Sequence, residues 1–147
     1  MEARSFDLEG QPPFQDPARV TWVVGWFNET LPAFLRANPR RNVSYLHIDS
    51  DIYSSASTAL TLLAPRLSVG AVLVFDELIN YPEFEQHEMR ALMEFQAATG
   101  RTVRVLGTSA AVIARSRAEY FRLTGRHGSE AALKKRGYKQ DAALQLL

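Results

Sequence analysis

The chain of 147 residues contains no cysteine, and this absence excludes several kinds of chemistry. Disulfide bridges, thiolate metal sites and a cysteine nucleophile cannot form. Histidine is scarce as well, because only His47, His87 and His127 occur and they are far apart in the sequence. Since protein zinc sites rely on Cys and His, this supply argues against zinc. The sequence also lacks a hydrolase elbow, a P-loop and a Gly-x-Gly-x-x-Gly turn.

Long apolar runs are missing too. No segment approaches the roughly 20 apolar residues that a membrane-spanning helix needs. The N-terminal stretch MEARSFDLEGQPPFQDP has early acidic residues and no apolar signal core. We therefore expect a cytoplasmic protein without a membrane partner. The formal net charge of +1 gives no electrostatic indication of nucleic acid binding, so we expect no such partner. Assembly into a homo-oligomer stays open.

What the sequence does contain is an alternation of short apolar runs and amphipathic segments. Residues 1–19 hold one glycine and three prolines, which indicates a loop or an ordered arm. Apolar runs predict strands at 20–24, 43–48 and 71–75. Helical spacing predicts helices at 27–37, from 54 to about 70, and from 82 to 100. Strands that are apolar on both faces are typical of a parallel sheet covered by helices.

The alternation of predicted strands and helices ends after residue 100. Two apolar runs, 103–106 and 111–114, are separated by Gly107-Thr108-Ser109, which is the spacing of a hairpin. The residues that follow are rich in Lys and Arg and look helical. The sequence thus predicts an arm (1–19), an α/β domain (20–115) and a basic helical extension (116–147). The predicted sheet is mostly parallel and ends in an antiparallel hairpin.

Two consecutive predicted strands end on carboxylates. Asp49 and Asp51 follow the strand at 43–48, and Asp76 and Glu77 follow the strand at 71–75. In an open parallel sheet, ligands bind beyond the carboxyl ends of the strands. Carboxylates gathered there repel one another unless they share a cation, and oxygen ligands favour Mg²⁺. An Asp at a strand end is also a frequent cap of the next helix, and Asp51 fits that role.

Three segments carry a family resemblance: GWFNETLP (25–32), LHIDSDIYSS (46–55) and APRLSVGAVLVFDELINYP (64–82). Together they resemble the macrocin O-methyltransferase-like family of class I S-adenosylmethionine-dependent methyltransferases. The resemblance implies a partial Rossmann-like fold with about the last five of the seven strands of a class I sheet. It implies methyl transfer from S-adenosylmethionine to a hydroxyl of a small molecule, assisted by Mg²⁺.

The resemblance also assigns roles to residues. Asp49 becomes the first metal ligand and the catalytic residue, and Asp76 and Glu77 become the acidic pair of the metal site. Glu77 stands where the family usually has a second Asp. The general base stays open between Asp49 and His47. The cofactor-binding positions implied by the resemblance are Gly25, Trp26, Phe27, Asp51 and Tyr53.

The more important departure from the family is an absence. A class I methyltransferase begins with a strand, a Gly-rich turn for the cofactor and a second strand that ends in an acid, and none of these occurs here. We therefore expect the C-terminal part of a methyltransferase. A truncated, non-catalytic methyltransferase-like module is the main alternative. A glycosyltransferase that uses Asp49-Ser50-Asp51 as a DxD motif is a weaker one.

Overall fold

The computed structural model describes residues 11–14, 16–81, 83–108 and 140–147. They belong to two compact units, Met1–Pro39 and Arg40–Leu147, which are described separately below. Among the described residues, no helix is both long and apolar enough to cross a membrane.

The first unit contains the helix α1 (Phe27–Ala37), at the predicted bounds. Trp26 precedes α1 as its N-cap residue, and the Thr30 hydroxyl donates a hydrogen bond of 2.9 Å to the Trp26 carbonyl. The strand predicted at 20–24 is wrong, because these residues have no strand partner and form an irregular segment. The Trp22 indole there donates a hydrogen bond of 3.1 Å to the Phe14 carbonyl, and the two rings meet edge to face.

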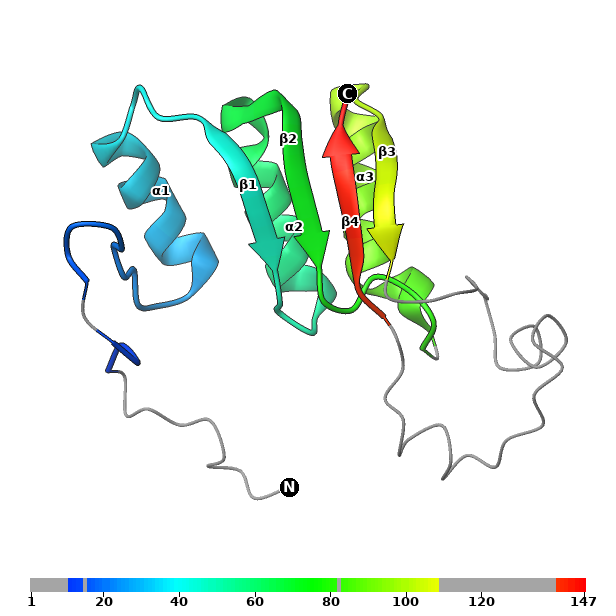
Figure 1. Cartoon of the computed structure of the whole chain (residues 1–147), viewed down its shortest axis with the longest axis horizontal. Helices are drawn as coiled ribbons and strands as arrows, with labels where there is room; N and C mark the ends of the chain where they lie inside the picture. The colour runs from blue at the N-terminus through cyan, green and yellow to red at the C-terminus, as the bar shows by residue number, and fades with distance from the viewer. Residues whose placement is uncertain (1–10, 15, 82, 109–139) are drawn as a thin grey trace, which may run out of the picture. The chain divides into compact units, whose positions relative to one another are not determined.

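The second unit is built on a four-stranded sheet with the order β1-β2-β4-β3. The strands are β1 (Val43–Ile48), β2 (Leu67–Phe75), β3 (Val103–Thr108) and β4 (Ala142–Leu146). β1 and β2 are parallel, and β4 lies antiparallel between β2 and β3. Three strands therefore run in one direction and β4 runs in the other, as the arrows in Figure 1 show. The predicted α/β class is confirmed.

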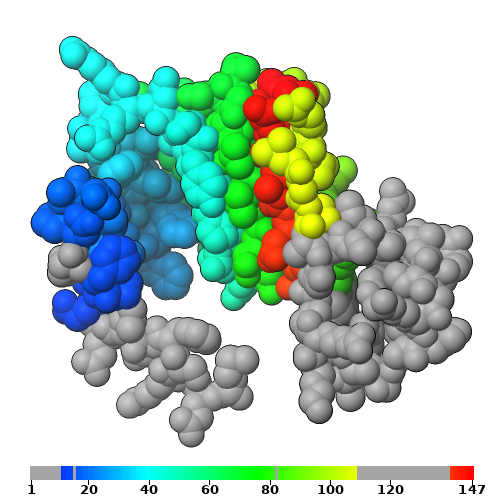
Figure 2. All heavy atoms as spheres, viewed as in Figure 1, coloured from blue at the N-terminus to red at the C-terminus, as the bar shows by residue number. Residues whose placement is uncertain are grey.

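Two helices cover one face of this sheet. The chain passes from β1 to α2 (Tyr53–Leu63), through the short 3-10 helix η1 (Ala64–Arg66), and into β2. It then passes through η2 (Phe84–Gln86) to α3 (Glu88–Thr99), which packs against α2. Both α2 and α3 lie behind the strands in Figure 1. Figure 2 shows the opposite face of the strands in the same view, which neither helix covers.

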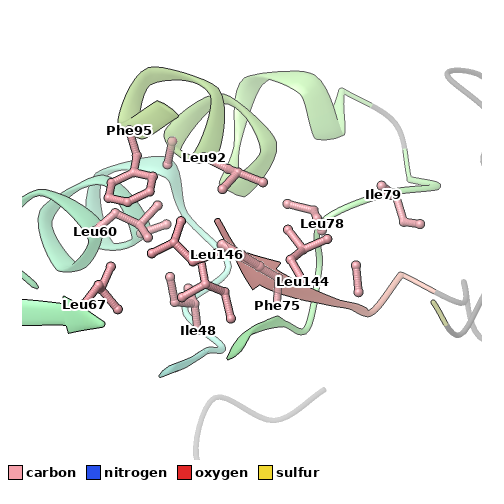
Figure 3. Close-up of a cluster of buried hydrophobic side chains, with 14 of the residues drawn as sticks. Ile48, Leu60, Leu67, Phe75, Leu78, Ile79, Leu92, Phe95, Leu144 and Leu146 are labelled. Carbon is pink, nitrogen blue, oxygen red and sulfur yellow. The ribbon is translucent and has the colours of Figure 1, made fainter. Parts of the chain in front are cut away.

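The core lies between the sheet and the two helices (Figure 3). Apolar side chains from every second position of β4, and of β2 from Ala71 to Phe75, point into it, because successive side chains of a strand alternate between faces. Helices α2 and α3 add apolar residues at helical spacing. The most deeply buried apolar side chains are Ala56, Leu60, Ala71, Leu73, Phe75 and Leu146.

Three predicted boundaries lie elsewhere in the structure. The helix predicted from residue 82 begins at Glu88, after the 3-10 helix η2, and the other two boundaries lie between α2 and β2. We expected the helix after β1 to end near Gly70, but α2 ends at Leu63 and β2 already begins at Leu67. Gly70 does have a positive φ, of 82°, as a helix-ending glycine often has. It lies inside β2, opposite the stretch of β1 where the pairing register shifts. In contrast, Gly100 ends α3 with a φ of 69°, as predicted.

The C-terminal prediction needs a larger correction. Residues 142–146, expected to be part of a helical extension, form the strand β4. The partner of β3 is β4 rather than the run at 111–114, which lies outside the described residues. The pattern of β4 is a strict alternation of buried and half-buried positions. The described sheet thus has four strands, and not the five expected.

The docking of β4 gives a first prediction. Leu146 is fully buried, whereas its neighbour Leu147 is 53% exposed. Leu146→Ala should lower the free energy of unfolding by about 2–5 kcal/mol, because it removes apolar contacts and leaves a cavity in the core. Leu147→Ala should change it by less than about 0.5 kcal/mol. Urea denaturation of both variants measures the difference, and equal effects would contradict the strand assignment.

Candidate functional site

Asp49 and Asp76 lie side by side at the carboxyl ends of neighbouring parallel strands. Ile48 and Phe75 are the last register partners of β1 and β2. The ladder continues by one bond, because the Asp76 N–H donates to the Ile48 carbonyl at 3.0 Å. The residues after Ile48 and Phe75 are Asp49 and Asp76, so strand pairing brings the two acids together. Their predicted convergence is confirmed at the level of the backbone.

A third carboxylate, Asp141, lies next to this pair of acids and was not predicted from the sequence. Phe75 pairs with Ala142 in the antiparallel β4, so Asp141 lies beside Asp76 at the same end of the sheet. The side chains of Asp76 and Asp141 are joined by a hydrogen bond. We call Asp49, Asp76 and Asp141 the acidic row. Asp141 was missed because residues 116–147 were expected to form a helix, although the alternating pattern of 142–146 is a strand signal.

The acidic row has the electrostatics of a crowded anionic site. Burial raises the pKa of Asp76, and the charges of Asp49 and Asp141 raise it further. The nearby His47 opposes this rise by lowering the pKa of Asp76. The pKa of Glu77 is also raised, first by burial and then by the charges of Asp51 and Asp76. Such mutual repulsion is relieved by protonation or by a shared cation.

Asp51 lies in a tight turn and does not act as the helix cap that we expected. Its φ is 58°, a left-handed conformation that Asp tolerates better than most residues. The Ile52 N–H donates a hydrogen bond of 2.6 Å to the Ser50 carbonyl inside this turn. Ile52 is the N-cap residue of α2, and no side chain caps the helix there. Asp51 lies near enough to Glu77 that its charge raises the pKa of Glu77.

Tyr53 opens α2 and its side chain engages α3. The Tyr53 hydroxyl donates a hydrogen bond of 2.5 Å to Glu94, and the Arg90 guanidinium lies 4.4 Å from the centre of the Tyr53 ring. Arg90 and Glu94 form an ion pair of 2.8 Å along α3. These contacts hold Tyr53 on the surface between the two helices. Its cofactor-binding role stays a prediction.

The predicted adenine-pocket residues Gly25, Trp26 and Phe27 belong to the first unit. Gly25 has a φ of 139°, and a Cβ at this position would lie only 2.7 Å from the Thr30 Cγ2 atom. Glycine is therefore required here by both the backbone and the packing. Trp26 is 73% exposed, so its ring is available for contact. Their role in cofactor binding stays a prediction.

Behind the acidic row lies a second group of polar residues that sequence reasoning did not single out. Glu88, the first residue of α3, is fully buried. Its Oε2 accepts a hydrogen bond of 3.3 Å from the Glu77 N–H, and the Ser50 backbone hydrogen-bonds to the same carboxyl group. Within the described residues, Glu88 Oε1, Ser50 Oγ and the Tyr81 hydroxyl are buried without a hydrogen-bond partner. Burial is the main cause that raises the pKa of Glu88 to about 7 and that of Tyr81 to about 12.

The comparison with protein families agrees with the motifs and the strand-end acids. The model of the macrocin O-methyltransferase family matches residues 6–113. The chain belongs to this family. Two curated relatives from Streptomyces are similar over shorter segments. One is the 8-demethyl-8-(2,3-dimethoxy-alpha-L-rhamnosyl)-tetracenomycin-C 4'-O-methyltransferase of Streptomyces olivaceus, 36% identical over 59 residues. The other is the demethyldecarbamoylnovobiocin O-methyltransferase of Streptomyces niveus, 34% identical over 64 residues.

These matches cover parts of each protein. They span 40% and 44% of this chain, but only 21% and 23% of the two relatives. Among solved structures, the O-methyltransferase NovP matches with a TM-score of 0.50 and 21% identity, over 84% of this chain and 36% of NovP. That likeness shows that the fold is the one found in an O-methyltransferase. This member of the macrocin O-methyltransferase family therefore spans well under half the length of the proteins it matches.

A metal site requires suitable ligand atoms and enough of them close together to bind the same ion. Carboxylate oxygens are the ligands that Mg²⁺ prefers. In residues 11–14, 16–81, 83–108 and 140–147, no three His, Asp or Glu side chains are arranged to hold a metal ion together. The three-carboxylate site predicted from Asp49, Asp76 and Glu77 is therefore not gathered as such. The Asp49–Asp76 pair still suits Mg²⁺, which often takes only one or two carboxylates and keeps several waters.

The buried Glu88 predicts an unusual dependence of stability on pH. Its pKa in the folded chain, about 7, is above the ordinary value of 4.5, so folding favours the protonated form. This contribution to stability is complete below pH 4.5 and is lost as the pH rises through about 7. Glu88→Gln mimics the protonated carboxyl group at every pH. With divalent ions removed, its stability relative to the wild type should rise by about 1–3 kcal/mol from pH 4.5 to pH 8.

Thermal and urea unfolding of both proteins at pH 4.5, 6, 7 and 8 measures this difference. Glu85→Gln, an exposed carboxylate three residues earlier, is the control and should show no such trend. A constant difference between Glu88→Gln and the wild type across the pH range would contradict the raised pKa.

Proposed function

We propose that this chain serves an O-methyltransferase that moves the methyl group of S-adenosylmethionine to a hydroxyl of a small molecule, with Mg²⁺ assistance. Family membership supports the reaction class. The observation that supports specific residues for this site is the position of Asp49 and Asp76 next to each other at adjacent strand ends. The carboxyl ends of such strands are where α/β sheets bind their ligands.

The roles of the acids follow from their surroundings. Asp49 and Asp76 are the proposed cation ligands, and waters and the acceptor oxygen would supply the remaining ligands. Glu77 borders them and shares their charge environment. When bound, Mg²⁺ would lower the pKa of the acceptor hydroxyl and hold it in place, and S-adenosylmethionine would supply an electrophilic methyl group. The bond that forms is oxygen–carbon, the sulfur–carbon bond breaks with its electron pair passing to sulfur, and the hydroxyl proton would pass to Asp49 or His47, the two candidate bases.

Asp49 is the residue that we propose to contact the reacting oxygen. It follows β1 directly, so the sheet fixes its backbone position. His47 is the other candidate for a base, and its charge reaches Asp76. The two curated relatives are named for acceptors that are large natural products, one of them bearing a rhamnosyl group. A hydroxyl on a sugar-like acceptor is accordingly the proposed substrate class.

Substitution of the two ligands tests the metal part of the proposal. Asp49→Asn and Asp76→Asn each remove a negative charge and an anionic ligand, so Mn²⁺, as a probe for Mg²⁺, should bind at least about tenfold more weakly. Isothermal titration calorimetry of the wild type and both variants measures the dissociation constants. Glu85→Gln, which removes an exposed carboxylate outside the site, should bind like the wild type. Equal affinities in all four proteins would contradict the site.

The reaction class needs a separate experiment. Calorimetry with S-adenosylhomocysteine, with and without Mg²⁺, on this chain and on any longer form that its gene encodes upstream, should show binding that Mg²⁺ strengthens. Binding by the longer form alone would favour the truncated, non-catalytic module for the short chain. Absence of binding in every form would contradict the methyltransferase proposal. Binding of uridine diphosphate with Mn²⁺ would instead support the glycosyltransferase alternative.

A further inference from the structure

Among the described residues, Glu88 is the one charged side chain that is fully buried. An ionisable group is rarely placed there unless it is paired or hydrogen-bonded, because burial without partners is costly. Glu88 lies in the first turn of α3, where an acidic residue usually faces solvent and interacts with the helix dipole. Here the carboxyl group is turned inward instead. Its position therefore calls for an explanation other than helix capping.

The contacts of Glu88 link the two loops that carry the proposed ligands. One of its bonds comes from the backbone of Glu77, the second residue after β2. The other comes from the backbone of Ser50, the second residue after β1. One carboxyl group thus ties together the residue that follows Asp49 and the residue that follows Asp76.

Each loop also has contacts or backbone angles of its own that constrain it. The loop after β2 is held on a different side, where the N–H groups of Leu78 and Ile79 both donate to the Gln140 carbonyl, at 3.1 and 3.2 Å. The loop after β1 contains the tight turn at Ser50 and the positive φ of Asp51. A left-handed non-glycine residue persists only where its surroundings hold it. Glu88 is a contact that can hold both loops at once.

We propose that Glu88 is a positioning residue, whose bonds to the backbones of Ser50 and Glu77 set the spacing of Asp49 and Asp76. Its consequence for metal binding rests on the proposed function, whereas the coupling of the two loops does not. Glu88 bonds to neighbours of the proposed ligands and acts through them. Outer groups of this kind typically alter metal affinity by roughly 10- to 100-fold when they are removed.

Backbone amide hydrogen exchange, followed by NMR, tests the coupling directly. Glu88→Gln keeps an acceptor oxygen of the same reach, and Glu88→Met keeps the length without a strong acceptor. In Glu88→Met, the amides of Ser50 and Glu77 should both exchange at least about tenfold faster than in the wild type. In Glu88→Gln they should stay within about threefold of the wild type, and Glu85→Gln should leave them unchanged.

The amides of β3, which is distant in the sheet order, report general loss of stability. Acceleration of the β3 amides to the same extent as Ser50 and Glu77, or acceleration of one loop only, would overturn the positioning role. Glu88→Asp replaces Glu88→Met if the latter does not fold, because the shorter carboxyl group cannot reach both backbones at once. The same acceleration of both loops is expected from it.

Titration with Mn²⁺ completes the test. If the wild type binds Mn²⁺, Glu88→Met should bind it roughly 10- to 100-fold more weakly and Glu88→Gln within about threefold. Wild-type affinity in Glu88→Met, with both loops still protected, would overturn the proposal. If the wild type binds no Mn²⁺, the metal part of the proposed function fails, while the exchange experiment still decides whether Glu88 couples the loops.

Discussion

The repulsion among carboxylates at one end of the sheet is the constraint on which the site depends. Parallel pairing of β1 with β2 places Asp49 beside Asp76, and antiparallel pairing with β4 adds Asp141. Backbone hydrogen bonds fix the positions of the three residues at this end of the sheet. Burial is the largest cause of the raised pKa of Asp76, and the charges of Asp49 and Asp141 raise it further. Such repulsion is relieved by protonation or by a shared cation, which is the basis of the proposed Mg²⁺ site.

The sequence predicted the parts of this arrangement that depend on local pattern. β1, α1 and the end of α3 were found because apolar periodicity and a terminal glycine mark them. The meeting of Asp49 and Asp76 followed from a general property of parallel strands. β4 could not be placed in the same way, because its partner β2 lies more than sixty residues earlier in the sequence. The nearby run at 111–114 offered a local hairpin that the long-range pairing replaced.

The missed site residues have a common cause. Asp141 and Glu88 act through tertiary contacts: one is brought to the row by β4, and the other is buried by the packing of α3. A single sequence shows Glu88 as an ordinary acidic residue in the first turn of a helix. For Asp51 the local signal was misleading. An acidic residue just before a helix suggests an N-cap, but Asp51 lies in the turn at Ser50 and its side chain does not cap α2.

The carboxyl groups at the sheet end and the buried carboxyl group of Glu88 have different surroundings. Asp76 and Glu77 lie at the sheet end, where a cation or a proton can neutralise them. Glu88 lies deeper and accepts hydrogen bonds from the backbones of Glu77 and Ser50, while its Oε1 atom has no hydrogen-bond partner among the described residues. In the proposed positioning role, the contacts of Glu88 would keep the spacing of Asp49 and Asp76 constant with or without a cation. Pre-organised ligands lose less entropy on binding, so two carboxylates held in this way would be better ligands for Mg²⁺ than two mobile ones.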